Sequence, residues 1–388
     1  MYSIIYLHPK TTKILKYKEC IKKCRLKEFI NHEFNINKEY IFLSICLPVY
    51  NMEKYIESAL LPLNPVCNNL YQNIYKNLSI INQSFKFFEI VIVNDNSNDD
   101  TVNLVKHIQN RDKRIININH SKNLGVYKSR TDAILNANGK YILFMDPDDI
   151  IFNQDIFQEL YNYYTEFNLD IIEFLVYHQR EGRKNIFFPK DHKFSHFHDF
   201  KKSIISQPEL SDIIFYKPNT KEYSSVICRT IWNKLIRKEI IQNSINYLNK
   251  DYFSNQFLIA ADDTPINILS FHFANNYSNI NLPGYLYNLR ENGMSRFNKV
   301  NINHNIILSY NFLLYFKFFY KYIISSNKDV NFFLFEFKAF SFYLLKLKEL
   351  NANEYITMTV NFYKEIRQKN ISETFQSFIN ESILYFMK

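Results

Sequence analysis

The sequence predicts an α/β protein, in which a Rossmann-like parallel sheet is flanked by helices and followed by a helical C-terminal region. Between residues 41 and 149, short apolar runs alternate with stretches of helical periodicity, which is typical of parallel strands joined by crossover helices. Each apolar run ends in polar or acidic residues, at the strand ends where such sheets bind ligands. After Asn301 the chain consists of long segments rich in Phe and Tyr, which favours packed helices.

The apolar runs are expected to be buried strands, because each is short and bounded by turn-forming residues. The first is IFLSICLPVYN at 41–51, and the next three lie at 88–95, 114–119 and 140–149. Because all four should be parallel, their polar ends should meet at one edge of the sheet.

Helices are expected between these strands. One should follow the first strand as far as about residue 83. A second is predicted over 97–109, where Ser97 can act as N-cap. A third is predicted over 125–139, with Gly139 as its C-terminal cap.

The second half of the α/β region is less regular. Residues 178–220 are polar and aromatic and are interpreted as an insertion or a mobile loop. From 227 to 298, short helix and strand signals surround the pair Asp262–Asp263. The predicted organisation is a basic helical extension (1–40), an α/β domain (41–299) with halves at 41–149 and 150–299, and a helical region (300–388).

Composition excludes a disordered or collagen-like chain, because 47% of the 388 residues are hydrophobic and 22% are charged. The net charge is +9, and the first forty residues carry nine Lys or Arg against four Glu. This excess of positive charge favours binding to nucleic acid, anionic lipid or an anionic substrate. A compositional bias of the genome would equally produce it.

The five cysteines are scattered, which favours a reducing compartment over a disulfide scaffold. The most apolar stretch, 306–324, contains Lys317 and Lys321 and is too polar to span a bilayer. A cytoplasmic protein is therefore expected, at most peripheral to the membrane.

The chain has only five glycines, so other residues must occupy left-handed turn positions. Asparagine tolerates that conformation best after glycine. We therefore expect Asn96, which follows the second strand, to have a left-handed or turn backbone.

Three acidic groups are candidates for chemistry. Asp146, Asp148 and Asp149 follow the fourth strand and can bind Mg²⁺ or Mn²⁺ or form a solvated turn. Asp95 can accept a hydrogen bond from a nucleobase or ribose, or cap the following helix. Asp262 and Asp263 begin a predicted helix, where one can act as general base or both can be partners of the helix dipole.

Other polar and aromatic groups are weaker candidates. His192, His196 and His198 lie in an irregular segment, so a metal site there is not expected. Trp232 is expected in the core rather than as a platform for a sugar. No nucleotide-binding glycine motif fits the positions of the five glycines.

In combination, the chain from Leu43 to Arg296 resembles the family 2 glycosyltransferases of GT-A fold. Four blocks occur in the order of that family: LSICLPVYN (43–51), FEIVIVNDNSNDDT (88–101), NLGVYKSRTDAILNANGKYILFMDPDD (123–149), and WNKLIRKEI…ADDTPINI…LYNLRENGMSR (232–296). The departures are Asn94, Asn96 and Thr131 in place of the usual Asp, Gly and Asn, and about fifteen extra residues between 60 and 78.

The resemblance implies roles for the donor half. The residues implied to line the nucleotide pocket are Pro48, Tyr50 and Asn51. Asp95 is implied to bind the base, typically uracil. Asp146 and Asp148 match the DXD element that holds the metal and the sugar nucleotide, with Asp149 beside them.

The resemblance also implies roles for the acceptor half. Asp263 matches the catalytic base, with Asp262 where the family usually has Glu. Arg290, Ser295 and Arg296 fall in a loop that closes over the diphosphate in relatives.

These matches imply a metal-dependent, inverting transfer from a nucleoside diphosphate sugar, expected to be UDP-linked. The acceptor is expected to be a hydroxyl of a glycan or glycolipid in bacterial surface-polysaccharide synthesis. The expected cofactor is Mn²⁺ or Mg²⁺, a peripheral contact with anionic membrane is expected at the basic ends, and nucleic acid is not an expected partner. Two alternatives remain, namely transfer to a polyprenyl phosphate and a non-catalytic basic binding module.

Overall fold

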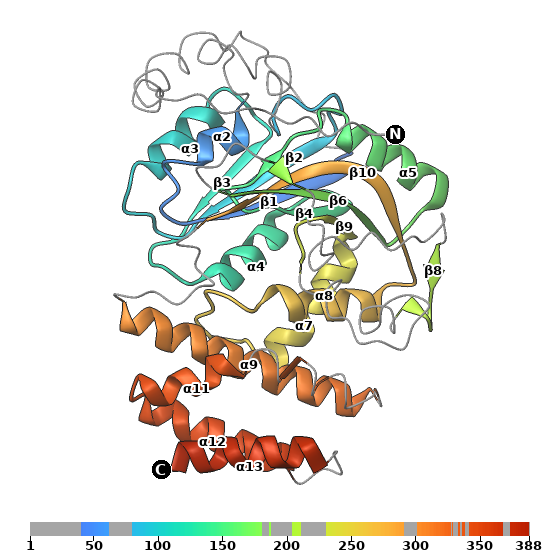
Figure 1. Ribbon diagram of the computed structural model, residues 1–388. Coiled ribbons are helices and arrows are strands. Elements are labelled where there is room, and N and C mark those ends of the chain that lie inside the picture. Colours follow the sequence, from blue (N-terminus) through green and yellow to red (C-terminus); the bar gives the residue numbers. More distant parts are fainter. Residues whose placement is uncertain are drawn as a thin grey trace.

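The computed structural model describes residues 40–61, 80–180, 186–187, 204–210, 230–290, 301–326, 328, 333, 336–337, 341–367 and 373–387. They form one mixed sheet with helices on both faces and a stack of helices below it (Figure 1). The predictions for the basic extension up to residue 39, the insertion at 62–79, most of 178–220, Ser295 and Arg296 lie outside the described residues.

Four parallel strands form the first half of the sheet, as predicted. They are β1 (Leu43–Val49), β2 (Phe88–Asn94), β3 (Ile115–Asn119) and β4 (Tyr141–Phe144), in the order β3-β2-β1-β4. Every residue of β1, β2 and β4 is buried, because helices cover both faces of the sheet.

The second half of the sheet is mixed, which the sequence did not predict. β9 (Lys234–Arg237) pairs antiparallel with β4 and with β6 (Ile171–Arg180). β6 lies parallel to β10 (Asn276–Leu289), and β5 (Ile150–Ile151) closes the edge against β10. The short strands β7 (Ile186–Phe187) and β8 (Ile205–Ser206) pair with β6 and β10.

Helices cover the two faces of the sheet (Figure 1). On one face lie α2 (Ile56–Leu60), α3 (Thr101–Gln109) and α5 (Ile156–Phe167), and on the other lie α4 (Val126–Asn136), α7 (Lys238–Asp251) and α8 (Asp263–Phe273). Side chains along β1 point alternately to the two faces of the sheet, so the sheet separates two hydrophobic clusters. Ile45 packs on the face of α2, α3 and α5, and Cys46 packs on the face of α4, α7 and α8.

Three helix predictions differ from the structure. The helix expected as far as about residue 83 is not continuous, because α2 ends at Leu60 and residues 80–83 are not helical. α3 begins at Thr101 with Asp100 as N-cap, so Ser97 lies in the preceding turn. α4 ends at Asn136, and Gly139 does not cap it. A Cβ at Gly139 would lie 2.4 Å from the Ser44 backbone nitrogen, so glycine permits close packing there instead.

The helical C-terminal region comprises α9 (Ile302–Ser325), α11 (Phe342–Glu349), α12 (Asn353–Arg367) and α13 (Glu373–Met387). It continues the core below the sheet, where buried Phe316 and Phe319 belong to the same cluster as Ile266 of α8. Among the residues that the structure describes, no helix has the length and apolarity needed to cross a membrane.

Candidate active site

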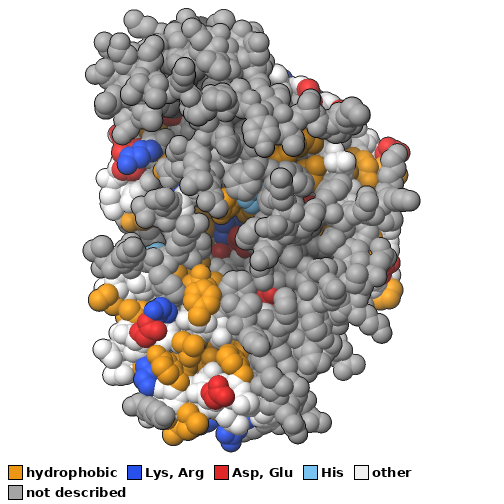
Figure 2. All heavy atoms as spheres, in the orientation of Figure 1, with side chains coloured by type: hydrophobic (Ala, Val, Ile, Leu, Met, Phe, Trp, Pro, Cys, Tyr) orange, Lys and Arg blue, Asp and Glu red, His pale blue; other side chains and the backbone are white. Residues whose placement is uncertain are grey.

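A cavity of about 740 Å³ opens at the carboxyl ends of β1, β2 and β4. In Figure 2, acidic and basic side chains are visible in a shaded hollow on the face shown. The cavity brings together seven of the residues singled out in the sequence: Pro48, Tyr50, Asp95, Asp146, Asp148, Asp263 and Arg290. Residues from both halves of the α/β domain therefore meet in one space.

Asn51 does not line the cavity but joins two of its loops. Its backbone has a positive φ of 54°, and its side-chain oxygen accepts a hydrogen bond from the Asn98 backbone at 2.8 Å. Asn96, with a φ of 60°, confirms the prediction of a left-handed backbone beside the second strand. Asparagine thus occupies two turns in which glycine would be the usual choice.

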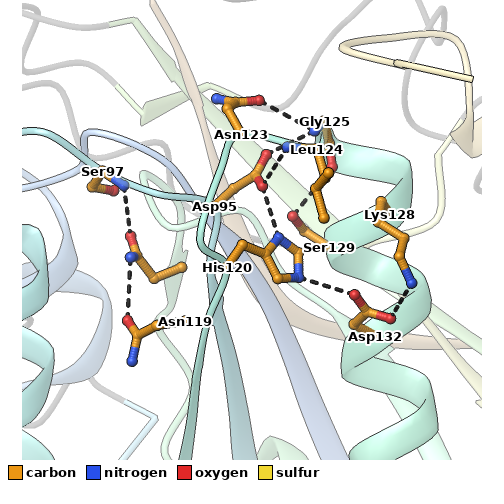
Figure 3. Close-up of polar contacts among 11 residues, drawn as sticks. Asp95, Ser97, Asn119, His120, Asn123, Leu124, Gly125, Lys128, Ser129 and Asp132 are labelled. Atoms are coloured by element: carbon orange, nitrogen blue, oxygen red, sulfur yellow. Dashed lines mark hydrogen bonds and ion pairs between the residues drawn. The ribbon is translucent and has the colours of Figure 1, made fainter.

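Asp95 is held by three donors (Figure 3). Oδ1 accepts from the Leu124 backbone nitrogen at 2.8 Å and lies 2.8 Å from His120 Nδ1, and Oδ2 accepts from the Gly125 backbone nitrogen at 2.8 Å. Gly125 is the N-cap of α4, so the carboxylate lies at the positive end of that helix. The side chain is buried yet borders the cavity.

Gly125 also links the two halves of the domain. Its φ is 88°, and a Cβ there would lie 2.5 Å from the Leu258 carbonyl oxygen. The next residue, Val126, donates its backbone N–H to that oxygen at 2.7 Å. Only glycine allows this approach, which ties the loop around Asp95 to the segment leading to Asp263.

The acidic group after β4 separates into two parts. Asp146 and Asp148 border the cavity, and the Asp146 side chain is 31% exposed. Asp148 pairs with Arg290, which also lies over the ring of Tyr55. Burial, followed by the charge of Asp146, raises the pKa of Asp148 to about 6, although Arg290 opposes this shift.

Asp149 faces away from the cavity, which does not fit its predicted role as a metal ligand. Its carboxylate accepts hydrogen bonds from the Tyr285 hydroxyl at 2.7 Å and from the Asn288 backbone at 2.8 Å. Burial, reinforced by Asp148 and Asp146, raises its pKa well above the usual value. It anchors β10 beneath the DXD element, and no group of three His, Cys, Asp or Glu within the described ranges is arranged to hold a metal.

Arg130 connects the acids of the two halves. Its Nη1 lies 2.5 Å from Asp262 Oδ2 and 2.8 Å from Asp263 Oδ1, and its Nη2 lies 3.3 Å from Asp146 Oδ1. Burial would lower the pKa of the guanidinium, but the three acids outweigh that effect and raise it. One buried cation thus fixes the separation of the DXD element and the predicted base.

Asp263 is the more accessible acid of its pair. Its side chain is 26% exposed, whereas that of Asp262 is 2% exposed. The contact with Arg130 lacks the alignment of a hydrogen bond, and the residues that the structure describes supply no other donor to Oδ1 of Asp263. Burial is the main cause that raises the pKa of Asp263 to about 7; Arg130 opposes it, while Asp262 and Asp146 add to it.

Trp232 is both a core residue and part of the cavity wall. It is 6% exposed, as the prediction of a core position requires. Its ring stacks against Tyr285 and Tyr287 with centroid distances of 5.0 Å, and Trp232 and Tyr287 border the cavity. Part of the cavity wall is therefore aromatic.

Sequence reasoning missed Arg130 and His120. Arg130 had a detectable signal, because it shares the buried stripe of α4 with Tyr127 and Ile134 at helical spacing. A cation in such a stripe must meet buried acids. His120 directly follows β3, at the edge of the sheet where Asp95 directly follows β2. This position is a weaker signal.

Comparison with known proteins gives a family. The model of glycosyl transferase family 2 matches residues 44–245. Glycosyltransferase GlyA of Streptococcus pneumoniae is 27% identical over 66% of this chain and 31% of its own length. The uncharacterized glycosyltransferase EpsJ of Bacillus subtilis is 24% identical over 65% of this chain and 62% of its own length. The matched part thus spans less than two thirds of each relative.

Two further proteins are similar over part of their length. A cholesterol galactosyltransferase of Borreliella burgdorferi is 27% identical over 44% of this chain and 45% of its own. A crystal structure of S. aureus TarS, residues 1–349, in complex with UDP-GlcNAc has a TM-score of 0.48 and 19% identity, covering 84% of this chain and 81% of that chain.

Proposed function

Because the chain belongs to glycosyl transferase family 2, we propose that it moves a sugar from a UDP-linked donor to an acceptor hydroxyl, with inversion at the sugar carbon. The observation that carries this proposal is the position of Arg130 between Asp146 and Asp263. A donor-binding acid and a candidate base are thereby held beside one cavity of about 740 Å³, a volume that accommodates a nucleotide sugar.

The donor half would bind the nucleotide through Asp95 and the loop around Tyr50. An ionised carboxylate offers about four acceptor positions, and three of those of Asp95 are used within the chain. The remaining position suits a single N–H donor such as N3–H of uracil. Cytosine has an acceptor at that ring position, so the preference for uracil has a physical reason.

Asp146 and Asp148 would hold Mn²⁺ or Mg²⁺ together with the diphosphate. Two carboxylates plus phosphate oxygens are a donor set that these hard cations accept, so the residues present fit such an ion without Asp149. The bound ion would stabilise negative charge on the leaving diphosphate. Arg290, which pairs with Asp148 and borders the cavity, would contact the same phosphates.

Asp263 would act as general base. Its carboxylate takes the proton of the acceptor hydroxyl while that oxygen forms a bond to C1 of the sugar. The C1–O bond to the diphosphate breaks on the opposite face, so the diphosphate leaves with the bonding electrons and the configuration inverts. A pKa of about 7 suits a group that must be ionised before attack and protonated afterwards.

The acceptor would be a glycan or glycolipid in surface-polysaccharide synthesis, with the reaction on the cytoplasmic face of the membrane. The aromatic wall of Trp232 and Tyr287 supports a saccharide acceptor, since sugar rings pack on such surfaces. The name of the Borreliella relative gives a lipid acceptor and supports the glycolipid alternative. The net charge of +9 supports a peripheral contact with anionic lipid.

A panel of UDP-, GDP- and CDP-sugars tests the donor class, first by thermal stabilisation and then by hydrolysis with and without Mn²⁺. We expect a UDP-sugar to stabilise the protein most and to be turned over. Stabilisation by a CDP-sugar instead would contradict the assignment of Asp95. Binding of nucleic acid or vesicles without turnover of any donor would favour the basic binding module, and turnover with polyprenyl phosphate would favour the alternative acceptor.

A further inference from the structure

We propose that His120 is a positioning residue for donor recognition, because it orients Asp95 through a row of paired side chains that continues to Asp132 and Lys128. This inference rests on the proposed function, in which Asp95 recognises the nucleobase. The side chain of His120 is only 7% exposed.

The geometry links four side chains in a row (Figure 3). His120 Nδ1 lies 2.8 Å from Asp95 Oδ1, and His120 Nε2 lies 2.9 Å from Asp132 Oδ2. Lys128 Nζ, one helical turn before Asp132, lies 2.6 Å from its other oxygen. The row therefore runs from a half-exposed lysine on α4 to the carboxylate at the cavity.

His120 joins Asp95 and Asp132 through its two ring nitrogens, and Lys128 contacts the second oxygen of Asp132. Each ring nitrogen lies within 3 Å of a carboxylate oxygen, so the ring is held from both sides. Buried polar groups need such partners, which makes the row a fixed support for Asp95.

His120 also limits how Asp95 can turn. The two backbone donors, Leu124 and Gly125, hold one oxygen each. The ring adds a second donor to Oδ1, so the open acceptor position is on Oδ2. Without the ring, Oδ1 also becomes an open acceptor, and a nucleobase donor meets a carboxylate with two competing positions.

The alternative is a purely structural role, in which His120 only connects the end of β3 to α4. Asn and Gln separate the two roles, because an Asn amide reaches the position of Nδ1 and a Gln amide reaches that of Nε2. His120→Asn therefore keeps a donor for Asp95 and loses the contact with Asp132. His120→Gln keeps the contact on the Asp132 side and loses the donor for Asp95.

The test is the dissociation constant for UMP and UDP by titration calorimetry in EDTA, which isolates the base and ribose from the metal. We expect His120→Gln to bind both nucleotides about tenfold more weakly, since it loses a charge-assisted hydrogen bond, and His120→Asn to stay within about threefold of wild type. Asp132→Leu, which keeps the ring but removes its acceptor, should weaken binding severalfold, whereas Asp132→Asn should not. Lys106→Ala, at an exposed position of α3 outside this row, is the surface control.

Equal nucleotide affinity in wild type, His120→Gln and Asp132→Leu would overturn the positioning role while leaving the proposed function intact. Equal losses in His120→Asn and His120→Gln would also overturn it, because they would indicate a purely structural tie. If His120→Gln does not fold, the Asp132→Leu and Asp132→Asn pair decides the question. A wild-type protein that binds neither UMP nor UDP would instead remove the donor assignment on which the inference rests.

Discussion

Asp95 and Asp263 are both carboxylates at the same cavity, but their surroundings are opposite. Asp95 has three donors aligned on it, two from the backbone of the Gly125 loop and one from His120. Asp263 has one close cation without hydrogen-bond alignment, and within the described part of the chain its Oδ1 has no other donor. The three donors fix the orientation of Asp95, whereas the surroundings of Asp263, chiefly its burial, raise the pKa of that carboxyl to about 7.

In the proposed function, this difference would separate recognition from proton transfer. A carboxylate that recognises a base must keep one orientation, so several donors suit it. A general base must gain and lose a proton near neutral pH, so too many donors would weaken it. Arg130, which touches Asp262, Asp263 and Asp146, provides just enough positive charge to keep three acids together.

The largest effect should come from removing the base. Asp263→Asn should lower kcat by about 10²–10⁴-fold, since an amide cannot accept the acceptor proton, while UDP affinity stays within about threefold. Turnover of a UDP-sugar with acceptor checks this, with Asp251→Asn, an exposed acid at the end of α7, as the control. Unchanged kcat in Asp263→Asn would assign the base elsewhere.

Removal of the metal should have the second-largest effect on turnover. EDTA should lower turnover by about two orders of magnitude, because the leaving diphosphate loses its Lewis acid, and Mn²⁺ or Mg²⁺ should restore it. Asp146→Asn should behave like EDTA treatment even with added metal. Asp149→Asn should mainly reduce stability, since Asp149 binds Tyr285 and Asn288 rather than facing the cavity. Activity in EDTA equal to that with Mn²⁺ would rule out the metal.

Arg130→Met should break the link between the two acids. Removing the cation leaves buried Asp262 without its partner, and the free energy of unfolding should fall by about 3–5 kcal/mol. Arg130→Lys should lose less stability, because it keeps the positive charge. It should still lose some, because an ammonium lacks the planar guanidinium that reaches several acids. Urea unfolding measures both variants. Equal stability of Arg130→Met and wild type would mean that the acids repack without the cation.

The pH profile should report the raised pKa of Asp263. The base must be ionised, so kcat should rise with pH through about 7 and be about tenfold lower at pH 6 than at its plateau. The stability effect has the opposite sign. Because the folded-state pKa lies above 3.8, its contribution to stability is present below that pH and is lost as pH rises through about 7. Flat kcat between pH 6 and 8 would contradict this environment.

The smallest effect should come from Ala261, next to the acidic pair. Its φ of 63° places an alanine in the left-handed region, at the border of the cavity. Ala261→Gly should therefore raise the free energy of unfolding by roughly 0.5–1 kcal/mol, measured by urea unfolding. Lower activity in this more stable variant would indicate that the strained backbone helps to aim Asp263.

The prediction of the fold was reliable where a single signal dominated. β1, β2 and β4 were found because continuous burial on both faces leaves an unbroken apolar run. The edge strand β3 was found from the shorter run IININ, in which only Ile115 is buried. The sequence did not predict the antiparallel strand β9, because it has only four residues, KLIR, and two of them are cations. Lys234 of that strand is fully buried beside Glu173, a pairing that is remote in sequence.

For the site, the sequence identified the acids but not their orientation. Asp146, Asp148 and Asp149 are equivalent as a sequence pattern, yet only the first two border the cavity. The difference arises because β10, over a hundred residues later, supplies Tyr285 and Asn288 as donors to Asp149. No local pattern contains that partner.

The sequence by itself determined the parallel half of the sheet, the convergence of acids at its edge, and the left-handed turn at Asn96, because periodicity, burial and backbone tolerance are local properties of the chain. Only the tertiary structure decided which acid is held by three donors and which has a raised pKa. That decision depends on Arg130 and His120, whose contacts act over a few ångströms in a buried site, between residues that are far apart along the chain.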